Sequence, residues 1–286
     1  MKHSLYFIIT ISFGLNFLGC KAIENQNEVP KKITYKTIHK QELDLHKKNI
    51  TGMVYSKNLK SLWVQTKTDN EPYLFLINPA TGKTKEKVFV RSTSLGWQGI
   101  SNHENTLHIG DIGDPKKRRR NIQVLSISER EIREQFAVPS MKTFSYPKSK
   151  KDAKAMVYHP TMKKFFIFTY GEEKTEIYSV SSKLKKGTLE KVGELPIAEV
   201  TDVHLSDDLS EIMIVTNSEV SVFAIKSDKD ILTTIEDGMP IFHKKLNKCT
   251  FKSACFYGEK NALCLLVHNP RHDKTYYTLE QKEGYF

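Results

Sequence analysis

Hydrophobic and polar positions alternate with a period of two along most of the chain after residue 50. The apolar runs are short, rich in β-branched and aromatic residues, and bounded by Gly, Pro, Asn and Asp, as β-strands are. The only helical pattern is residues 129–136 (EREIREQF), one or two turns in a connection. The pattern predicts an all-β protein, with its clearest strands at residues 61–66, 73–77, 106–110, 121–127, 164–169, 211–216, 220–225 and 262–268.

A short motif, the step, in which a small or short polar residue is followed by apolar ones, recurs at intervals of about 50 residues. Each time it is followed by a turn and by at least two further strands. Four strands per unit of this length is the pattern of a β-propeller blade. We expect five blades, with six as the alternative. A β-sandwich with insertions fits the strand spacing but does not explain a repeated step. The five steps begin at Gly52, Gly99, Ala155, Asp202 and Ser253.

Residues 33–39 (ITYKTIH) form one more strand pattern ahead of the first unit. The last unit shows only three strands, so it lacks an outer one. We therefore expect residues 33–39 to pair with the last unit and close the ring.

The N-terminus has the layout of a secretory signal peptide: basic Lys2, an apolar stretch over residues 5–15, and Gly19 before Cys20. The stretch is too short to span ~30 Å of hydrocarbon. A Cys after a small residue at this distance resembles a bacterial lipobox, whose Cys is lipidated. We expect a signal peptide over residues 1–19, a lipidated Cys20 with a flexible tether to residue 32, and a propeller domain over residues 33–286. An ordinary signal peptide with an incidental Cys is the alternative.

Three cysteines remain, Cys249, Cys255 and Cys264, so at most one intramolecular bridge can form. Residues 255–264 read as a hairpin that places Cys255 opposite Cys264. An exported protein permits a disulfide there. Buried thiols that pack as small hydrophobes are an equal alternative.

The chain is basic, with 44 Lys and Arg against 33 Asp and Glu and a net charge of +11. One run concentrates this charge: Lys116, Lys117, Arg118, Arg119 and Arg120. Such a run binds anionic partners, and export excludes nucleic acid, which leaves lipid headgroups, sulfated glycans or acidic protein surfaces. A solvated loop is the alternative.

Several segments resemble a family of secreted bacterial β-propeller proteins that carry a GDIGDN…R…I.VYR motif and look distantly related to phytase-like and esterase-like propellers. Residues 107–114 (LHIGDIGD) with 121–124 (NIQV) carry the clearest match. The resemblance implies a propeller over most of the mature chain, from about Ile50 to Val267. The supporting pieces, in order, are residues 50–53, 62–64, 78–82, 96–100, 152–156 and 200–202.

The chain departs from that family where the inner strands begin. Members tend to carry acidic residues there, and the resemblance implies that such carboxylates ring the axial funnel and hold a hard cation such as calcium. Here Gln98 and Lys154 stand at two of those places, and residues 252–254 (KSA) lack the third acid. We therefore expect the acidic site to be lost or altered.

Four residues remain candidates for ligand or cation contact: Asp111 and Asp114 around Gly113, and Asp202 with His204 on the fourth step. The alternative for the two aspartates is that they cap backbone N–H groups in a tight turn. For Asp202 and His204 it is an ordinary place at a strand end.

No nucleophile elbow, phosphate loop or HExxH motif is present, so catalytic residues stay unassigned and no cofactor is expected, calcium being the one candidate. We expect a monomeric bacterial lipoprotein at the outer membrane or cell surface. Its propeller would be a non-enzymatic domain that binds an anionic glycan or a protein, including host matrix or plasma proteins. The alternative function is a calcium-dependent phytase-like or esterase-like hydrolase.

Overall fold

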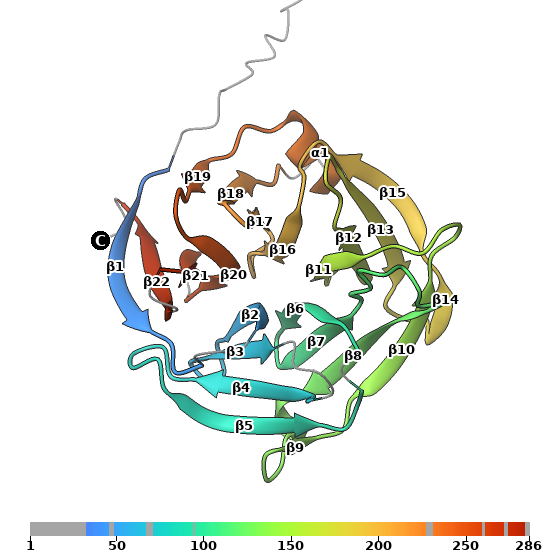
Figure 1. Cartoon of the computed structure of the whole chain (residues 1–286), viewed down its shortest axis with the longest axis horizontal. Coiled ribbons are helices and arrows are strands. Elements are labelled where there is room, and N and C mark those ends of the chain that lie inside the picture. Colours follow the sequence, from blue (N-terminus) through green and yellow to red (C-terminus); the bar gives the residue numbers. More distant parts are fainter. Residues whose placement is uncertain are drawn as a thin grey trace, which may run out of the picture.

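The computed structural model describes residues 33–283 except 46–48, 67–70, 94, 227–230, 259–260 and 272–273. Its strands form five sheets arranged as blades around a central axis (Figure 1). The prediction of an all-β, five-bladed propeller is confirmed. The predicted signal peptide, Cys20 and tether lie outside the described residues.

Each blade is an antiparallel sheet of four main strands, given below in order from the axis to the outer edge. Blade one holds β2 (Ile50–Ser56), β3 (Ser61–Thr66), β4 (Tyr73–Ile77) and β5 (Thr84–Val90). Blade two holds β6 (Trp97–His103), β7 (Thr106–Asp111), β8 (Ile122–Ser128) and β10 (Ser140–Ser145). Blade three holds β11 (Ala153–His159), β12 (Lys164–Thr169), β13 (Thr175–Ser181) and β15 (Glu190–Leu195).

Blade four holds β16 (Val200–Leu205), β17 (Glu211–Thr216), β18 (Glu219–Ala224) and β19 (Phe242–Lys245). Blade five holds β20 (Thr250–Tyr257), β21 (Ala262–Asn269), β22 (Lys274–Lys282) and, as its outer strand, β1 (Tyr35–Glu42). The repeated step predicted from the sequence lies in the innermost strand of every blade. These five inner strands pack side by side around the axis (Figure 1).

At two of these steps the first residue must be small, because neighbouring inner strands approach each other closely there. A Cβ on Gly99 would lie 2.6 Å from the backbone nitrogen of Met156 in the next blade, and Gly99 has a φ of +73°. A Cβ on Gly52 would lie 2.8 Å from the side chain of Ile100. Both distances are shorter than real Cβ contacts, so the tight central ring requires small residues at these two positions.

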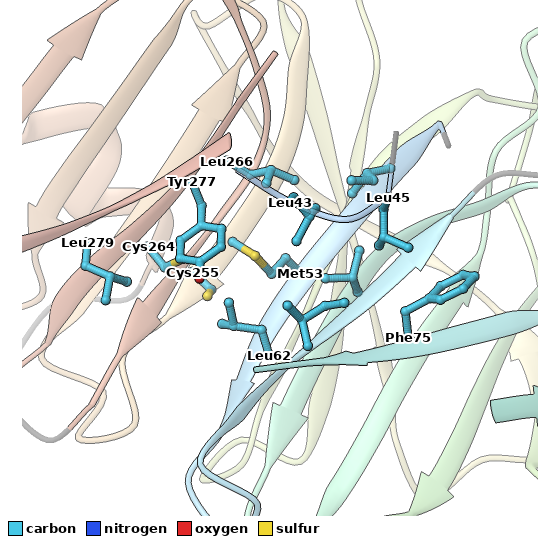
Figure 2. Close-up of a cluster of buried hydrophobic side chains, with 13 residues drawn as sticks. Leu43, Leu45, Met53, Leu62, Phe75, Cys255, Cys264, Leu266, Tyr277 and Leu279 are labelled. Atoms are coloured by element: carbon cyan, nitrogen blue, oxygen red, sulfur yellow. The ribbon is translucent and has the colours of Figure 1, made fainter. Parts of the chain in front are cut away.

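The N-terminal strand closes the ring as predicted. β1 pairs antiparallel with β22, from Tyr35 opposite Lys282 to Glu42 opposite Tyr276. The chain then crosses to blade one, where the Tyr277 hydroxyl donates a hydrogen bond to the Pro79 carbonyl. Figure 2 shows the buried cluster that fills this seam, with side chains from both blades: Leu43, Leu45, Met53, Leu62, Phe75, Cys255, Cys264, Leu266, Tyr277 and Leu279.

Blades two, three and four are joined to the blade before them by the connection that leads to their outer strand. β9 (Phe136–Ala137) adds parallel to β5, and β14 (Lys186–Thr188) adds parallel to β10. In blade four the connection instead carries α1 (Ile231–Asp237), whose Leu232 lies against Gly193 of β15. The blades therefore support one another at the periphery as well as at the axis.

The helix predicted over residues 129–136 is wrong. Only Glu129–Glu131 forms a single 3₁₀ turn, and the chain then extends into β9. The Glu129 carboxylate is buried, accepting hydrogen bonds from Trp63 Nε1 at 2.8 Å and Ser56 Oγ at 3.0 Å in blade one. The helix α1 was not expected, because four of its seven residues are β-branched and favour strand.

Candidate functional site

Each of the five inner strands has an irregular pairing near its first residue, and these five starting points lie at the same end of the central axis. The antiparallel register shifts there in every one of them, as at a β-bulge, and a bulge turns a side chain away from the sheet. The residues at these shifts line one cavity of about 380 Å³, which we call the axial mouth. They are Thr51, Gln98, Lys154, Thr201 and Lys252.

The burial pattern agrees with this direction. Gln98, Lys154, Thr201 and Lys252 are half-buried, whereas the residues on either side of each are buried. The residue that follows each register shift points toward a neighbouring blade instead, as Gly52 does after Thr51 and Gly99 does after Gln98. The repeated step thus has two parts, a side chain that enters the mouth and a small residue that packs between blades.

The mouth has a basic character. The Lys154 ammonium lies 3.2 Å from the centroid of the Tyr170 ring, a cation–π contact. Among the described residues no carboxylate forms an ion pair with Lys252, which also lines the mouth. Asp152 is the acidic residue of the wall, and its Oδ1 accepts a hydrogen bond of 2.7 Å from the Asp114 backbone N–H. The positions of Gln98 and Lys154 are two of those where the resembling family carries acids.

Asp111 and Asp114 stabilise the loop beside the mouth. Asp111 Oδ1 accepts hydrogen bonds from the Gly96 backbone N–H at 2.7 Å and from Arg119 Nη1 at 2.9 Å. Asp114 Oδ2 accepts one from the Arg119 backbone N–H at 2.7 Å. Burial raises the pKa of Asp111 above its ordinary value, although the adjacent Arg119 opposes this shift. These are the hydrogen bonds of the turn-capping alternative, and a ligand contact of either aspartate stays a prediction.

The basic run divides into two kinds of residue. The Arg119 side chain turns inward onto Asp111 and the Gly113 carbonyl and is only 17% exposed. Its four neighbours are exposed and follow Pro115, which lines the axial mouth. The exposed members are Lys116, Lys117, Arg118 and Arg120.

Asp202 and His204 come together in blade four, with 3.0 Å between Asp202 Oδ2 and His204 Nε2. The same carboxylate oxygen accepts a hydrogen bond from Ser253 Oγ of blade five. Both residues are buried, and His204 lines a recess of about 20 Å³ beside Cys255 rather than the mouth. The structure thus joins Asp202 to Ser253 across two blades, a contact that nothing in the sequence indicates. Asp202 and His204 do not lie with Asp111 and Asp114.

Cys255 and Cys264 lie directly opposite each other in the β20–β21 hairpin, so the predicted register is confirmed. Both are buried free thiols in the structure, and Cys249 is a half-buried one. Burial, together with a hydrogen bond to Cys264, raises the pKa of the Cys255 thiol. A bridge between the two stays a prediction.

Among the residues that the structure describes, no three His, Cys, Asp or Glu side chains group closely enough to hold a metal ion. Likewise, no helix within the described ranges has the length and apolar character needed to cross a bilayer.

The fold defines the chain as a β-propeller protein. No family model and no curated protein matches the sequence. Solved structures with a similar fold include the nidogen/laminin complex, 11% identical with a TM-score of 0.46 over 80% of this chain and 78% of that one. The β-propeller domain of Myceliophteria thermophila Cps50 (Swd1) is 13% identical, with a TM-score of 0.42 over 82% and 85%.

Hydrazine synthase from Kuenenia stuttgartiensis is 12% identical, with a TM-score of 0.41 over 80% of this chain. The present chain spans 58% of that protein's length. At these identities the similarity concerns the fold alone.

Proposed function

We propose that this protein is a bacterial lipoprotein, anchored through Cys20 at the outer membrane or cell surface, whose propeller is a non-enzymatic binding domain for an anionic partner. One observation carries the proposal: basic side chains gather at the face where the inner strands begin. Lys154 and Lys252 line the axial mouth, and the exposed part of the run 116–120 starts next to Pro115 at its rim.

A polyanionic glycan suits the rim better than a single small anion does. Lys116, Lys117, Arg118 and Arg120 are exposed, and each exposed charge binds weakly by itself. A chain with many sulfate or carboxylate groups meets several of them at once and gains affinity by multivalency. The resemblance to the secreted propeller family supports export and the fold, and it does not specify this ligand.

The hydrolase alternative needs its carboxylates to meet a cation or substrate. Asp111 is completely buried and paired with Arg119, and Asp202 is completely buried and accepts a hydrogen bond from Ser253. These contacts hold the loop and the two blades together and leave the carboxylates unable to meet a cation or substrate. They therefore favour the binding function over the hydrolase.

Heparin binding by the full chain tests the proposal. The rim variant changes Lys116, Lys117, Arg118 and Arg120 to Gln and leaves Arg119 in place. The control removes four exposed lysines from outer turns and edges: Lys83, Lys183, Lys185 and Lys186, each to Gln. We expect the rim variant to lose about tenfold in affinity at low salt and the control to stay within about twofold.

Increasing salt should weaken wild-type binding steeply and rim-variant binding less, because fewer exposed charges remain to be screened. Equal losses in the two variants would show a diffuse basic surface and contradict the proposal. Retained binding in both would show that the rim residues do not bind the glycan and would also contradict the proposal.

A further inference from the structure

We propose that the anion-binding surface of this propeller consists of two loops rather than one, and that it binds a linear, densely sulfated glycan chain that lies across both. The first loop is residues 112–121, between β7 and β8, and the second loop is residues 146–152, between β10 and β11. The second loop adds Lys148 and Lys150 to the rim residues. This inference rests on the proposed function, and it specifies the extent of the surface and the class of glycan.

Two hydrogen bonds join the loops. Lys150 Nζ donates to the Arg118 carbonyl at 2.9 Å, and Asp152 Oδ1 accepts from the Asp114 backbone N–H at 2.7 Å. The bases of both loops belong to one buried hydrophobic cluster, through Ile112, Ile122 and Ala153. The two loops therefore form a single structural unit, which we call the two-loop surface.

The exposed charges of the two-loop surface are all positive. Its acidic residues, Asp114 and Asp152, are buried, and each accepts a hydrogen bond from a backbone N–H of the first loop. Lys151 is paired with Glu176 at 2.6 Å, and Arg119 is paired as described above. The remaining six cations are exposed, and none of them forms an ion pair with another described residue: Lys116, Lys117, Arg118, Arg120, Lys148 and Lys150.

The first loop is held in shape before any ligand binds. The Lys117 backbone N–H donates to the Asp114 carbonyl at 2.8 Å and closes a turn. Arg119 fixes the far end of the loop through its largely buried ion pair, and Lys150 holds the Arg118 carbonyl between these two points. A loop that is already ordered loses little conformational entropy on binding. Its charges therefore give more affinity than those of a mobile loop, which favours a binding surface over the solvated-loop alternative.

The density of charge selects the class of glycan. Cations that lie in adjoining loops repel one another, and closely spaced anions relieve this repulsion. Arg118 and Arg120 also present planar guanidinium groups, which bind oxyanions through two parallel hydrogen bonds. A glycan with several sulfates on each repeat matches these groups, whereas one with a single carboxylate per disaccharide leaves most of them unmatched.

The distribution of the cations over two loops selects a chain rather than a short anion. A chain that spans both loops engages cations of each at once and gains affinity by multivalency. A disaccharide meets only part of the surface, and its exposed contacts are individually weak. We therefore expect affinity to increase with the length of the glycan.

Calorimetric titration of the full chain with three oligosaccharides tests the ligand class. They are a heparin octasaccharide, a heparin disaccharide and a hyaluronan octasaccharide, which carries carboxylates and no sulfate. We expect the heparin octasaccharide to bind at least about tenfold more tightly than either of the others.

A pair of substitutions in the second loop tests the extent of the surface. Lys148→Gln combined with Lys150→Gln should weaken binding of the heparin octasaccharide about tenfold at low salt. The matched control, Lys83→Gln combined with Lys163→Gln, removes two exposed lysines from the β4–β5 and β11–β12 turns and should leave the Kd within about twofold.

Lys150→Gln also removes the hydrogen bond to Arg118, so a second pair separates charge from loop structure. Lys148→Arg combined with Lys150→Arg keeps both charges and a donor at each position, and should bind within about twofold of wild type. If the Gln pair does not fold, Lys148→Gln alone, which leaves the bond to Arg118 in place, should still weaken binding about threefold.

The inference is wrong if the second-loop Gln pair loses no more affinity than the control, or if hyaluronan or the disaccharide binds as tightly as the heparin octasaccharide. The rim variant described above separates this failure from that of the proposed function. A loss in the rim variant without a loss in the second-loop pair would keep the proposed function and remove the two-loop surface. No loss in either would contradict both, and so would a loss in the second-loop pair alone.

Discussion

The guanidinium of Arg119 lies 2.9 Å from the carboxylate of Asp111, which is completely buried. This contact takes one residue out of a basic run that the sequence presents as uniform. The same Arg119 donates its backbone N–H to Asp114 and a second side-chain hydrogen bond to the Gly113 carbonyl at 3.1 Å. The loop that begins the rim of the axial mouth is therefore built around a largely buried ion pair.

Replacing Arg119 by Gln should destabilise the protein by about 2–4 kcal/mol, because it leaves the Asp111 carboxylate buried without its cation. Arg118→Gln, an adjacent and exposed change, should cost less than about 0.5 kcal/mol. Urea unfolding of the two variants measures the difference. Equal stabilities would show that the ion pair contributes nothing measurable to the fold.

Deleting residues 33–40 should unfold the chain or make it aggregate. The deletion removes most of β1 and exposes the edge of β22, and unpaired strand edges associate. It also removes Thr37, whose hydroxyl donates to Glu280 at 3.0 Å. Thermal unfolding should show little change for the control deletion of residues 21–30, and the same melting temperature in both would contradict closure by this strand.

His108 should make stability fall with acid. Burial, together with the nearby charges of His103 and Lys142, lowers the pKa of His108 from 6.5 to about 3. Between these two values the unfolded state binds a proton that the folded state does not. The free energy of unfolding therefore decreases as the pH falls from about 6.5 towards 3, by at most about 1.4 kcal/mol per pH unit.

Above pH 6.5 His108 is neutral in both states and contributes no pH dependence. His108→Asn retains a group that can hydrogen-bond to Ser126, the present partner at 2.8 Å, and cannot titrate. Urea unfolding at a series of pH values should show a shallower slope below pH 6.5 for this variant. An unchanged slope would show that other groups cause the acid sensitivity.

Cys249 should react with a thiol reagent in the native protein while Cys255 and Cys264 do not. Cys249 is half-buried, whereas the other two are buried, and a raised pKa keeps the Cys255 thiol protonated. Mass spectrometry after native alkylation counts the modified residues. Denaturation without reductant then distinguishes two free thiols, which become modified, from a bridge, which stays protected. Native modification of Cys255 would contradict the burial described here.

Changing Cys20 to Ser should abolish fatty-acid labelling and leave the protein uncleaved or released from the membrane. The thiol of Cys20 is the attachment point that the lipobox resemblance implies. Metabolic labelling with a fatty acid, compared between the two proteins, provides the measurement. A mutant that is still labelled would show that the lipid is attached elsewhere.

Much of the architecture was accessible from local pattern. The period of two and the recurring step at Gly52, Gly99 and Ala155 reflect constraints that each blade repeats independently, namely one buried strand face and close packing at the axis. The closing strand could be inferred because the last unit has three strand patterns and one strand remained ahead of the first. The connections between strands could not be inferred. The residues of α1 have a strand-like composition, yet they form a helix where they pack on β15.

The site shows the same division. Composition alone locates the basic run. The export of the chain stays a prediction from the pattern of its N-terminus, and the loss of acids at Gln98 and Lys154 is what the family resemblance implies. Which charges face solvent and which are buried depends on contacts between residues distant in sequence, such as Asp202 with Ser253 or Glu129 with Trp63. The axial mouth exists only because five bulges, one per blade, turn toward one axis, and no local pattern encodes that convergence. The sequence therefore determined the repeating unit and its charge, while the closed ring decided which side chains meet.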